Sequence, residues 1–190
     1  WYGRKGPASP IAGDLSQCTL QNDAVHLVIT GGEPLLKGFQ PALRELIYHP
    51  DVFTRFVTFE TNGTQIFAPD NSVEFTRKFG VNKNSGITWS VSPKLSNSGE
   101  KWEEAIRPEA LASYNAWPYS YLYLKFVVRD EEDMKEVHEA VREYDHARIN
   151  IDAIYIMPET GVFSKSDTEI AQLALKYGYK YSPRLQINLF

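Results

Sequence analysis

The sequence predicts an α/β fold built around a largely parallel sheet. Short runs of β-branched and aromatic residues alternate about five times with stretches of helical periodicity, which is the pattern of α/β proteins. Most of the strand-like runs end in polar clusters, as expected where chemistry gathers at the carboxyl ends of parallel strands. The 190 residues contain no internal repeat, so we expect one domain over residues 1–190, with residues 1–24 mostly loop.

Six runs are predicted as strands from their β-branched and aromatic content. The first is closed by Gly31-Gly32, and the second alternates in polarity and stops at the turn dipeptide Asn62-Gly63. The fourth has the sequence YLYLKFVV and carries the strongest strand signal. The predicted strands are residues 25–30, 56–61, 87–91, 121–128, 153–157 and 185–190.

Helices are predicted between these strands. Residues 39–48 place their apolar side chains on one helical face, and Pro108 suits the first turn of a helix. Asp130 is a candidate N-cap for a helix whose first turn is acidic. The predicted helices are residues 39–48, 72–79, 108–117, 130–144 and 167–177.

Composition excludes several classes of protein. With 43% hydrophobic and 23% charged residues, the chain is globular rather than disordered. No apolar run reaches the roughly 18 residues of a membrane span, and a net charge of -4 argues against bulk electrostatic binding of nucleic acid. The single cysteine, Cys18, excludes an internal disulfide framework and a metal site made of several cysteines of this chain.

The two ends of the chain suggest a piece of a longer protein. Trp1 opens the chain without a methionine, and Phe190 ends it inside an apolar run. The first residues lack the apolar stretch and cleavage site of a secretory signal. We therefore expect further residues beyond both ends and a cytoplasmic location.

Four polar clusters follow the first, second, third and fifth predicted strands. Each cluster alone is most simply a turn, but parallel strands would bring all four to one edge of the sheet. Four together therefore favour a binding site over four unrelated turns. The clusters are Thr30-Gly31-Gly32-Glu33-Pro34, Glu60-Thr61-Asn62-Gly63, Ser92-Pro93-Lys94 and Met157-Pro158-Glu159-Thr160.

The residue types in these clusters suit a ligand that carries both an ammonium group and a carboxylate. The glycines let backbone amides come close to a ligand, and Glu33 can receive an ammonium group. Lys94 can pair with a carboxylate, and Ser92 can donate to one. Because Asn62 can hold a sugar hydroxyl, an amino-acid-bearing nucleoside is the expected ligand.

Several segments resemble a known family. Residues 26–34 (HLVITGGEP) resemble the GGEP segment of radical S-adenosylmethionine enzymes. Residues 60–64 (ETNGT), residues 91–95 (VSPKL) and the closing Pro183-Arg184-Leu185 resemble, more specifically, the 7-carboxy-7-deazaguanine synthase family. The resemblance runs from about His26 to Phe190 and so covers most of the chain.

The resemblance implies a partial (β/α)6 barrel that binds S-adenosylmethionine on a [4Fe-4S] cluster, with Mg²⁺ assisting. In this family a 5′-deoxyadenosyl radical takes hydrogen from 6-carboxy-5,6,7,8-tetrahydropterin. The ring contracts, ammonia leaves and 7-carboxy-7-deazaguanine forms, a step toward queuosine and other deazapurines. We also expect a homodimer and an electron donor such as flavodoxin or ferredoxin, with no nucleic-acid or membrane partner.

The resemblance assigns roles position by position. Thr30 and Gln186 match positions that contact the pterin substrate, although many members have His where this chain has Gln186. Gly32 matches the glycine whose backbone meets S-adenosylmethionine, and Met157 stands where the family often has Gln. The expected cofactor-binding residues are Gly32, Glu33, Asn62, Ser92, Pro93, Lys94, Met157, Pro158, Glu159 and Thr160.

One departure from the family concerns the cluster. The family binds it through three cysteines on a loop that precedes the GGEP strand, whereas Cys18 stands alone here. Either the first strand and the cluster loop are missing from this chain, which we favour, or the barrel has no cluster. We therefore expect a three-cysteine loop upstream of Trp1.

The sequence is also compatible with two other functions. The chain could belong to another radical S-adenosylmethionine enzyme, such as a glycyl-radical activase, or it could be a non-catalytic nucleoside-binding barrel that lacks the cluster.

Lys125 either points into the barrel or reaches solvent at an edge. Trp89, Trp102 and Trp117 are interpreted as packing residues, with pterin stacking as the alternative.

Overall fold

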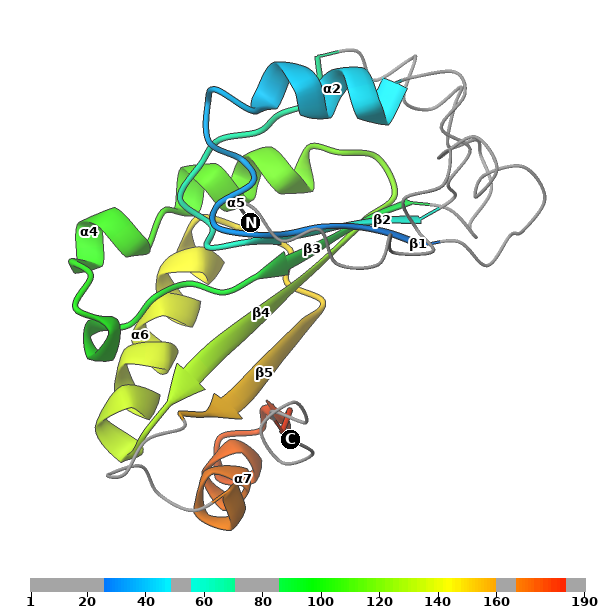
Figure 1. The fold of residues 1–190 in the computed structure, drawn as a ribbon. Helices are drawn as coiled ribbons and strands as arrows, with labels where there is room; N and C mark the ends of the chain where they lie inside the picture. The colour runs from blue at the N-terminus through cyan, green and yellow to red at the C-terminus, as the bar shows by residue number, and fades with distance from the viewer. Residues whose placement is uncertain (1–25, 49–55, 71–85, 160–166, 184–190) are drawn as a thin grey trace, which may run out of the picture.

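The computed structural model describes residues 26–48, 56–70, 86–159 and 167–183 (Figure 1). Strands and helices alternate along these residues. The strands are β1 (His26–Ile29), β2 (Phe56–Thr61), β3 (Gly86–Val91), β4 (Ser120–Val128), β5 (Ala153–Pro158) and β6 (Lys180–Tyr181). The helices are α2 (Gln40–Tyr48), the short 3₁₀ helix η1 (Ser96–Ser98), α4 (Trp102–Ala105), α5 (Pro108–Asn115), α6 (Glu131–His146) and α7 (Asp167–Lys176).

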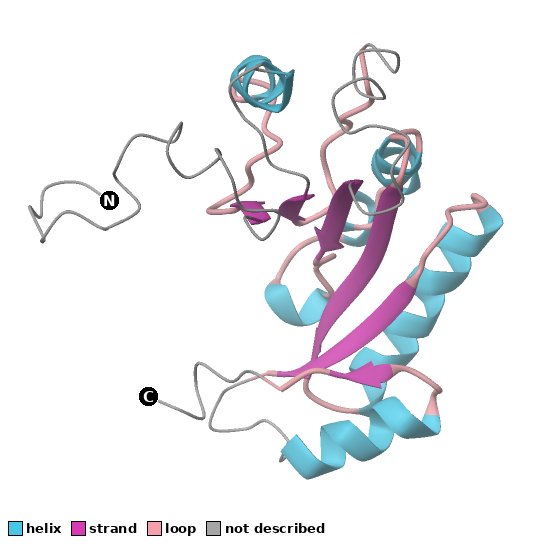
Figure 2. Cartoon of the chain, turned by 90° about the vertical axis from the view of Figure 1, so that its right-hand side faces the viewer, coloured by secondary structure: helices cyan, strands magenta, loops and turns pink. Residues whose placement is uncertain are grey.

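The described strands form one sheet in which all neighbours are parallel and the spatial order is the chain order, β1 to β6. Right-handed crossovers between neighbouring parallel strands place their helices on the same side of a sheet. Figures 1 and 2 show the result, a curved sheet with α2, α5, α6 and α7 around its outer side. The predicted α/β fold with a parallel sheet is confirmed, and this arrangement is compatible with a partial barrel.

The two faces of the sheet differ in polarity because side chains alternate along each strand. The outer face is apolar and packs under the helices to form the hydrophobic core. Its buried strand residues are Val57, Phe59, Ile87, Trp89, Val91, Leu122, Leu124, Phe126 and Ile156. The opposite, concave face carries mainly polar and aromatic residues, among them Thr58, Glu60, Ser90, Tyr123, Lys125 and Tyr155, which the strand register places beside one another.

Stacked aromatic rings fill the core beneath β2 and β3. The ring of Trp89 lies between Phe59, at 4.8 Å between centroids, and Tyr114 of α5, at 4.5 Å. Phe67 stacks on Trp117 at 5.4 Å. All five rings are buried on the outer face. Trp89 and Trp117 are therefore packing residues, as the sequence predicts, and neither ring reaches the concave face.

The predicted elements match the described structure closely. Strand β2 has the predicted bounds, and β1, β3, β4 and β5 lie within one residue of theirs at each end. The structure adds η1, α4 and β6, which are too short to show a hydrophobic period. The predicted loop 1–24, helix 72–79 and strand 185–190 lie outside the described residues. In the described ranges, no helix has the length and apolar content needed to cross a membrane.

The predictions that Asp130 caps a helix and that Trp102 is a packing residue are also confirmed. Asp130 caps α6, because its carboxylate accepts hydrogen bonds from the backbone N–H groups of Glu132 (2.9 Å) and Asp133 (3.1 Å). Trp102 of α4 packs against the core, and its Nε1 donates to Glu143 of α6 (3.1 Å). The first contact stabilises the start of α6, and the second joins α4 to the end of the same helix.

Gly63, which follows β2, occupies a position that only glycine fits. Its φ of 81° is left-handed, and an added Cβ would lie 2.7 Å from Val91 Cγ1. Gly99 has a similar φ of 83° with open space around it. We expect Gly63→Ala to lower the free energy of unfolding by about 1–3 kcal/mol more than Gly99→Ala, because only Gly63→Ala adds overpacking to the backbone strain. Urea unfolding of both variants measures this difference, and equal losses would contradict the close approach.

Candidate functional site

The segments that follow β3 and β5 are hydrogen-bonded to the neighbouring strands β2 and β4 near the carboxyl edge of the sheet. The backbone N–H of Ser92 donates to the carbonyl of Thr61 (2.8 Å), and the Ser92 hydroxyl donates to the carbonyl of Lys125 on β4 (3.1 Å). On the far side, the N–H of Glu159 donates to the carbonyl of Val128 (3.0 Å). The polar clusters after neighbouring strands therefore form one continuous edge, where parallel α/β sheets bind their ligands.

Glu33 joins the cluster after β1 to the cluster after β2. Its Oε1 accepts hydrogen bonds from the Leu35 N–H (3.0 Å) and the Thr61 hydroxyl (2.8 Å). Its Oε2 accepts one from the Asn62 N–H (2.7 Å). A carboxylate offers about four acceptor positions, so Glu33 has one left for a ligand. Its main structural effect is to hold the glycine turn against the end of β2.

Gly31 and Gly32 form an open turn in front of this anchor. Their φ values are 101° and 55°, both left-handed, and both residues are exposed. A Cβ added to either glycine would meet no atom within 4 Å. Their backbones therefore border free space at the edge of the sheet, while Pro34 and Leu35 are buried directly behind them. A ligand can approach this backbone closely, as the sequence predicts.

Asn62 has only part of its side chain available. Its Oδ1 accepts hydrogen bonds from the backbone N–H (3.0 Å) and the hydroxyl (2.8 Å) of Thr64, which closes a local turn. The side-chain NH₂ makes no hydrogen bond to the described residues. Contact with a sugar would therefore run from the Asn62 amide to a hydroxyl oxygen, since the amide oxygen is already used.

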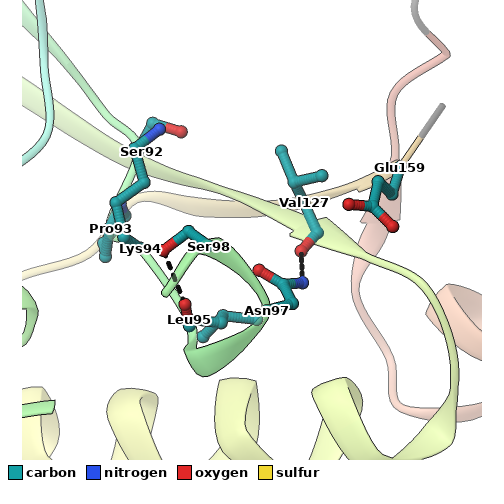
Figure 3. Close-up of a pocket in the computed structure, with 8 residues that line it drawn as sticks. All are labelled: Ser92, Pro93, Lys94, Leu95, Asn97, Ser98, Val127 and Glu159. Carbon is teal, nitrogen blue, oxygen red and sulfur yellow. Dashed lines mark hydrogen bonds between the residues drawn. The ribbon is translucent and has the colours of Figure 1, made fainter. Parts of the chain in front are cut away.

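An open hollow of about 270 Å³ lies next to the Ser92-Pro93-Lys94 segment (Figure 3). Lys94 is exposed and forms no ion pair with the described residues, so its charge is available to a ligand. Figure 3 shows Glu159 on the opposite side of the hollow, beyond Val127. The hollow thus offers a cation at one side and a carboxylate at the other.

The remaining predicted residues lie at or beyond the β5 side of the hollow. Met157 pairs in register with Val127, which lines the hollow, and Pro158 is the buried last residue of β5. Thr160 and Gln186 lie outside the described residues. The structure therefore brings the predicted residues of β1, β2, β3 and β5 to one edge, with these two positions undescribed.

A polar network that the sequence analysis did not single out lies behind Asn97 and Val127, which line the hollow. Asp133 is buried and accepts hydrogen bonds from the Arg129 N–H (2.8 Å), Nε (3.1 Å) and terminal guanidinium nitrogen (3.0 Å). Asn97 donates both to Asp133 (2.8 Å) and to the carbonyl of Val127 (2.9 Å). The Arg129 Nε also lies 3.9 Å from Glu159 Oε2. This network ties η1, the end of β4 and the start of α6 together around the hollow.

The network also sets the protonation of Asp133. Burial raises the pKa of this carboxyl group, but the hydrogen bonds from Arg129 and Asn97 outweigh burial and hold the pKa below its ordinary value. The only sequence signal was the acidic first turn of a helix, which explains why the partners were missed. Arg129 precedes the helix cap, and Asn97 is 36 residues away.

A second network lies on the concave face, just inside the edge. The Thr30 hydroxyl donates to Glu60 Oε2 (3.0 Å), and Lys125 Nζ lies 3.3 Å from Glu60 Oε1. Thr30 directly follows β1, Glu60 belongs to β2 and Lys125 belongs to β4. Lys125 therefore faces the concave side, which resolves the two orientations that its sequence position left open.

Comparison with known proteins identifies relatives. No family model matches the chain. A protein named 7-carboxy-7-deazaguanine synthase from Halobacterium salinarum is 32% identical over 88% of this chain and 65% of its own length. Proteins of the same name from Rhodopirellula baltica (27% identical, 93% of this chain, 66% of the relative) and Hyperthermus butylicus (32%, 85% and 63%) also match.

The chain is homologous to 7-carboxy-7-deazaguanine synthases. The resemblance found in the sequence is thereby confirmed. The chain spans 63–66% of the length of the curated relatives that it matches.

The positions that the resemblance to these synthases singles out differ in what surrounds them. Glu33 and Ser92 hold neighbouring segments of the edge in place through their side chains. Gly32 and Lys94 are exposed and face no protein partner among the described residues. The structure therefore separates residues that build the edge from residues that are free to contact a ligand.

Asp133 gives a prediction about acid stability. A carboxylate whose pKa is lowered by folding stabilises the protein above its unfolded pKa, about 3.9, and this contribution is lost as the pH falls through the lower, folded value. We expect the native protein to be more stable than Asp133→Asn at about pH 6, with the difference shrinking below about pH 4. Urea unfolding across this range measures both.

The control for this experiment is Glu103→Gln, which changes an exposed carboxylate of α4. The control should follow the native protein at every pH. A constant difference between the native protein and Asp133→Asn from about pH 6 down to about pH 2.5 would show that Asp133 does not titrate as its partners require.

Proposed function

We propose that this chain forms the greater part of a 7-carboxy-7-deazaguanine synthase. The reaction converts 6-carboxy-5,6,7,8-tetrahydropterin into 7-carboxy-7-deazaguanine with loss of ammonia, and it supplies deazapurines such as queuosine. The observation that carries the proposal is the open edge formed by Gly32 and Lys94 in a chain homologous to these synthases. The proposal includes a cytoplasmic homodimer that receives electrons from a flavodoxin or ferredoxin.

The residues of the edge fit S-adenosylmethionine. Lys94 would bind the methionyl carboxylate, and the Gly31-Gly32 backbone would lie against the cofactor where no side chain intrudes. The Asn62 amide would donate to a ribose hydroxyl, and residues 157–160 would border the adenosine. When bound and reduced, this cofactor supplies a radical that abstracts hydrogen. The protein residues orient the two ligands and exclude water from the concave face.

The residues of this chain do not fit a [4Fe-4S] cluster on their own. Such clusters are held by several cysteine thiolates, whereas the chain contains only Cys18. The described residues also contain no group of three or more His, Cys, Asp or Glu side chains able to hold a metal ion. The proposal therefore requires cluster ligands from residues outside these 190, and we derive no step through the cluster or through Mg²⁺.

Turnover by the full-length protein tests the proposal. The protein, reconstituted with iron and sulfide under anaerobic conditions, is incubated with S-adenosylmethionine, a reductant and 6-carboxy-5,6,7,8-tetrahydropterin. We expect 7-carboxy-7-deazaguanine and 5′-deoxyadenosine by mass spectrometry. Nucleoside binding without either product, in a full-length protein that lacks cluster-binding cysteines, would instead support a non-catalytic barrel. The non-catalytic barrel is considered because this chain contains a single cysteine.

Lys94 should determine the affinity for S-adenosylmethionine. A charge-assisted hydrogen bond contributes about 1.5–3 kcal/mol, so Lys94→Ala should weaken binding roughly ten- to a hundred-fold. Lys101→Ala is the control, because Lys101 is exposed and pairs with Glu104 away from the hollow. Calorimetry on cluster-loaded protein measures both affinities. Equal affinity in the two variants would remove Lys94 from the site.

Thr30 should act on the pterin and leave the cofactor unaffected, since its hydroxyl faces the concave side before the glycine turn begins. Thr30→Val keeps the side-chain shape but leaves a substrate polar group unpaired, at about 1–3 kcal/mol. We expect 7-carboxy-7-deazaguanine formation to fall about ten-fold or more while uncoupled formation of 5′-deoxyadenosine continues. Parallel loss of both products would show that Thr30 serves the cofactor or the fold.

A further inference from the structure

The Thr30–Glu60–Lys125 network fixes the direction of its hydrogen bonds. A carboxylate is an acceptor only, so both neighbours of Glu60 must donate to it. Lys125 donates from Nζ across 3.3 Å, and Thr30 donates its single hydroxyl hydrogen across 3.0 Å. With that hydrogen used, the Thr30 oxygen can offer only lone pairs to any further partner.

The setting of the network favours this arrangement. The Lys125 side chain is 23% exposed and that of Glu60 is 43% exposed, so the ion pair borders the concave space without being sealed off from it. Ser90 lies on the same face, in register with Glu60, and its buried hydroxyl has no hydrogen-bond partner in the described structure. Closed (β/α)8 barrels fill this region with branched apolar side chains, whereas the concave face here presents oriented polar groups.

We propose that Lys125 is a positioning residue that acts through Glu60 to make Thr30 a hydrogen-bond acceptor, and thereby selects a substrate ring that presents an N–H donor. This inference rests on the proposed function and deepens it. A tetrahydropterin carries N–H groups on its reduced ring, at N5 and N8. In the fully oxidised pterin both nitrogens are acceptors and would face the lone pairs of Thr30. The network therefore distinguishes the reduced substrate from its oxidised form.

The size of this selection follows from the chemistry. A site built to receive a hydrogen bond rejects a ligand that lacks the donor, because two acceptors are left facing each other. We expect the native protein to bind 6-carboxy-5,6,7,8-tetrahydropterin at least about ten-fold more tightly than oxidised 6-carboxypterin. Without Lys125, Glu60 loses the charge that holds it in place, and the Thr30 hydroxyl is free to turn and donate to the oxidised ring.

Anaerobic titration of full-length, cluster-loaded protein with each pterin tests the inference. Lys125→Met should lose most of the preference for the reduced ligand, and Lys125→Arg should retain it. Thr30→Val should also lose it, and adding Lys125→Met to Thr30→Val should cause no further loss. Lys135→Met, which removes an exposed lysine paired with Glu132 on α6, is the matched control and should behave as the native protein.

The outcomes separate this inference from the proposed function. A native protein that forms 7-carboxy-7-deazaguanine while Lys125→Met keeps its full preference, or whose two substitutions cause additive losses, overturns the inference alone. A native protein that neither binds the reduced pterin nor turns it over overturns both. If Lys125→Met fails to fold, as judged by thermal unfolding, Glu60→Gln replaces it. Its amide can donate to Thr30, so it should also lose the preference, and retention would overturn the inference.

Discussion

Burial of one face of the sheet is the constraint on which the rest of this structure depends. Side chains alternate along a strand, so a shift of one residue would exchange the two faces. Such a shift in β2 would put Glu60 among the buried aromatic rings and expose Phe59, which is fully buried against Trp89. The apolar outer face therefore fixes the register, and the register places the polar residues on the concave face.

The same constraint explains why function concentrates at one edge. Each described strand runs in the same direction and follows its neighbour in the sequence, so the segments that leave their carboxyl ends lie together. Two acidic side chains then hold these segments in place. Glu33 joins the turn after β1 to the end of β2, and Asp133 joins η1, β4 and α6. Asp133 uses its acceptor positions on protein donors and Glu33 uses all but one, which leaves mainly Gly32, Lys94 and the Asn62 amide to face a ligand.

Much of this arrangement could be predicted from the sequence. Alternating polarity and turn dipeptides fixed the bounds of β2, and the capping chemistry of Asp130 fixed the start of α6. The clustering of polar residues after strands pointed to the correct edge because parallel topology requires it. The sequence motifs also resemble the family to which the relatives of this chain belong.

The parts that could not be predicted depend on contacts between distant residues. Thr30 and Glu60 are 30 residues apart, and Glu60 and Lys125 are 65 apart, so no local pattern indicates their hydrogen bonds. Sequence reasoning treated Glu33 as a free carboxylate because its partners Thr61 and Asn62 belong to another strand end. The short elements α4 and β6 were missed for a different reason, since four and two residues carry no measurable periodicity.

The most direct test of the account is a crystal structure of the full-length protein with S-adenosylmethionine and the tetrahydropterin bound together. The account predicts the cofactor against the Gly31-Gly32 backbone, with its carboxylate within hydrogen-bond distance of Lys94 Nζ. It places the pterin on the concave face, with a ring N–H directed at the Thr30 oxygen. Density for either ligand on the helix-covered side, or a pterin that makes no contact with Thr30, would contradict it.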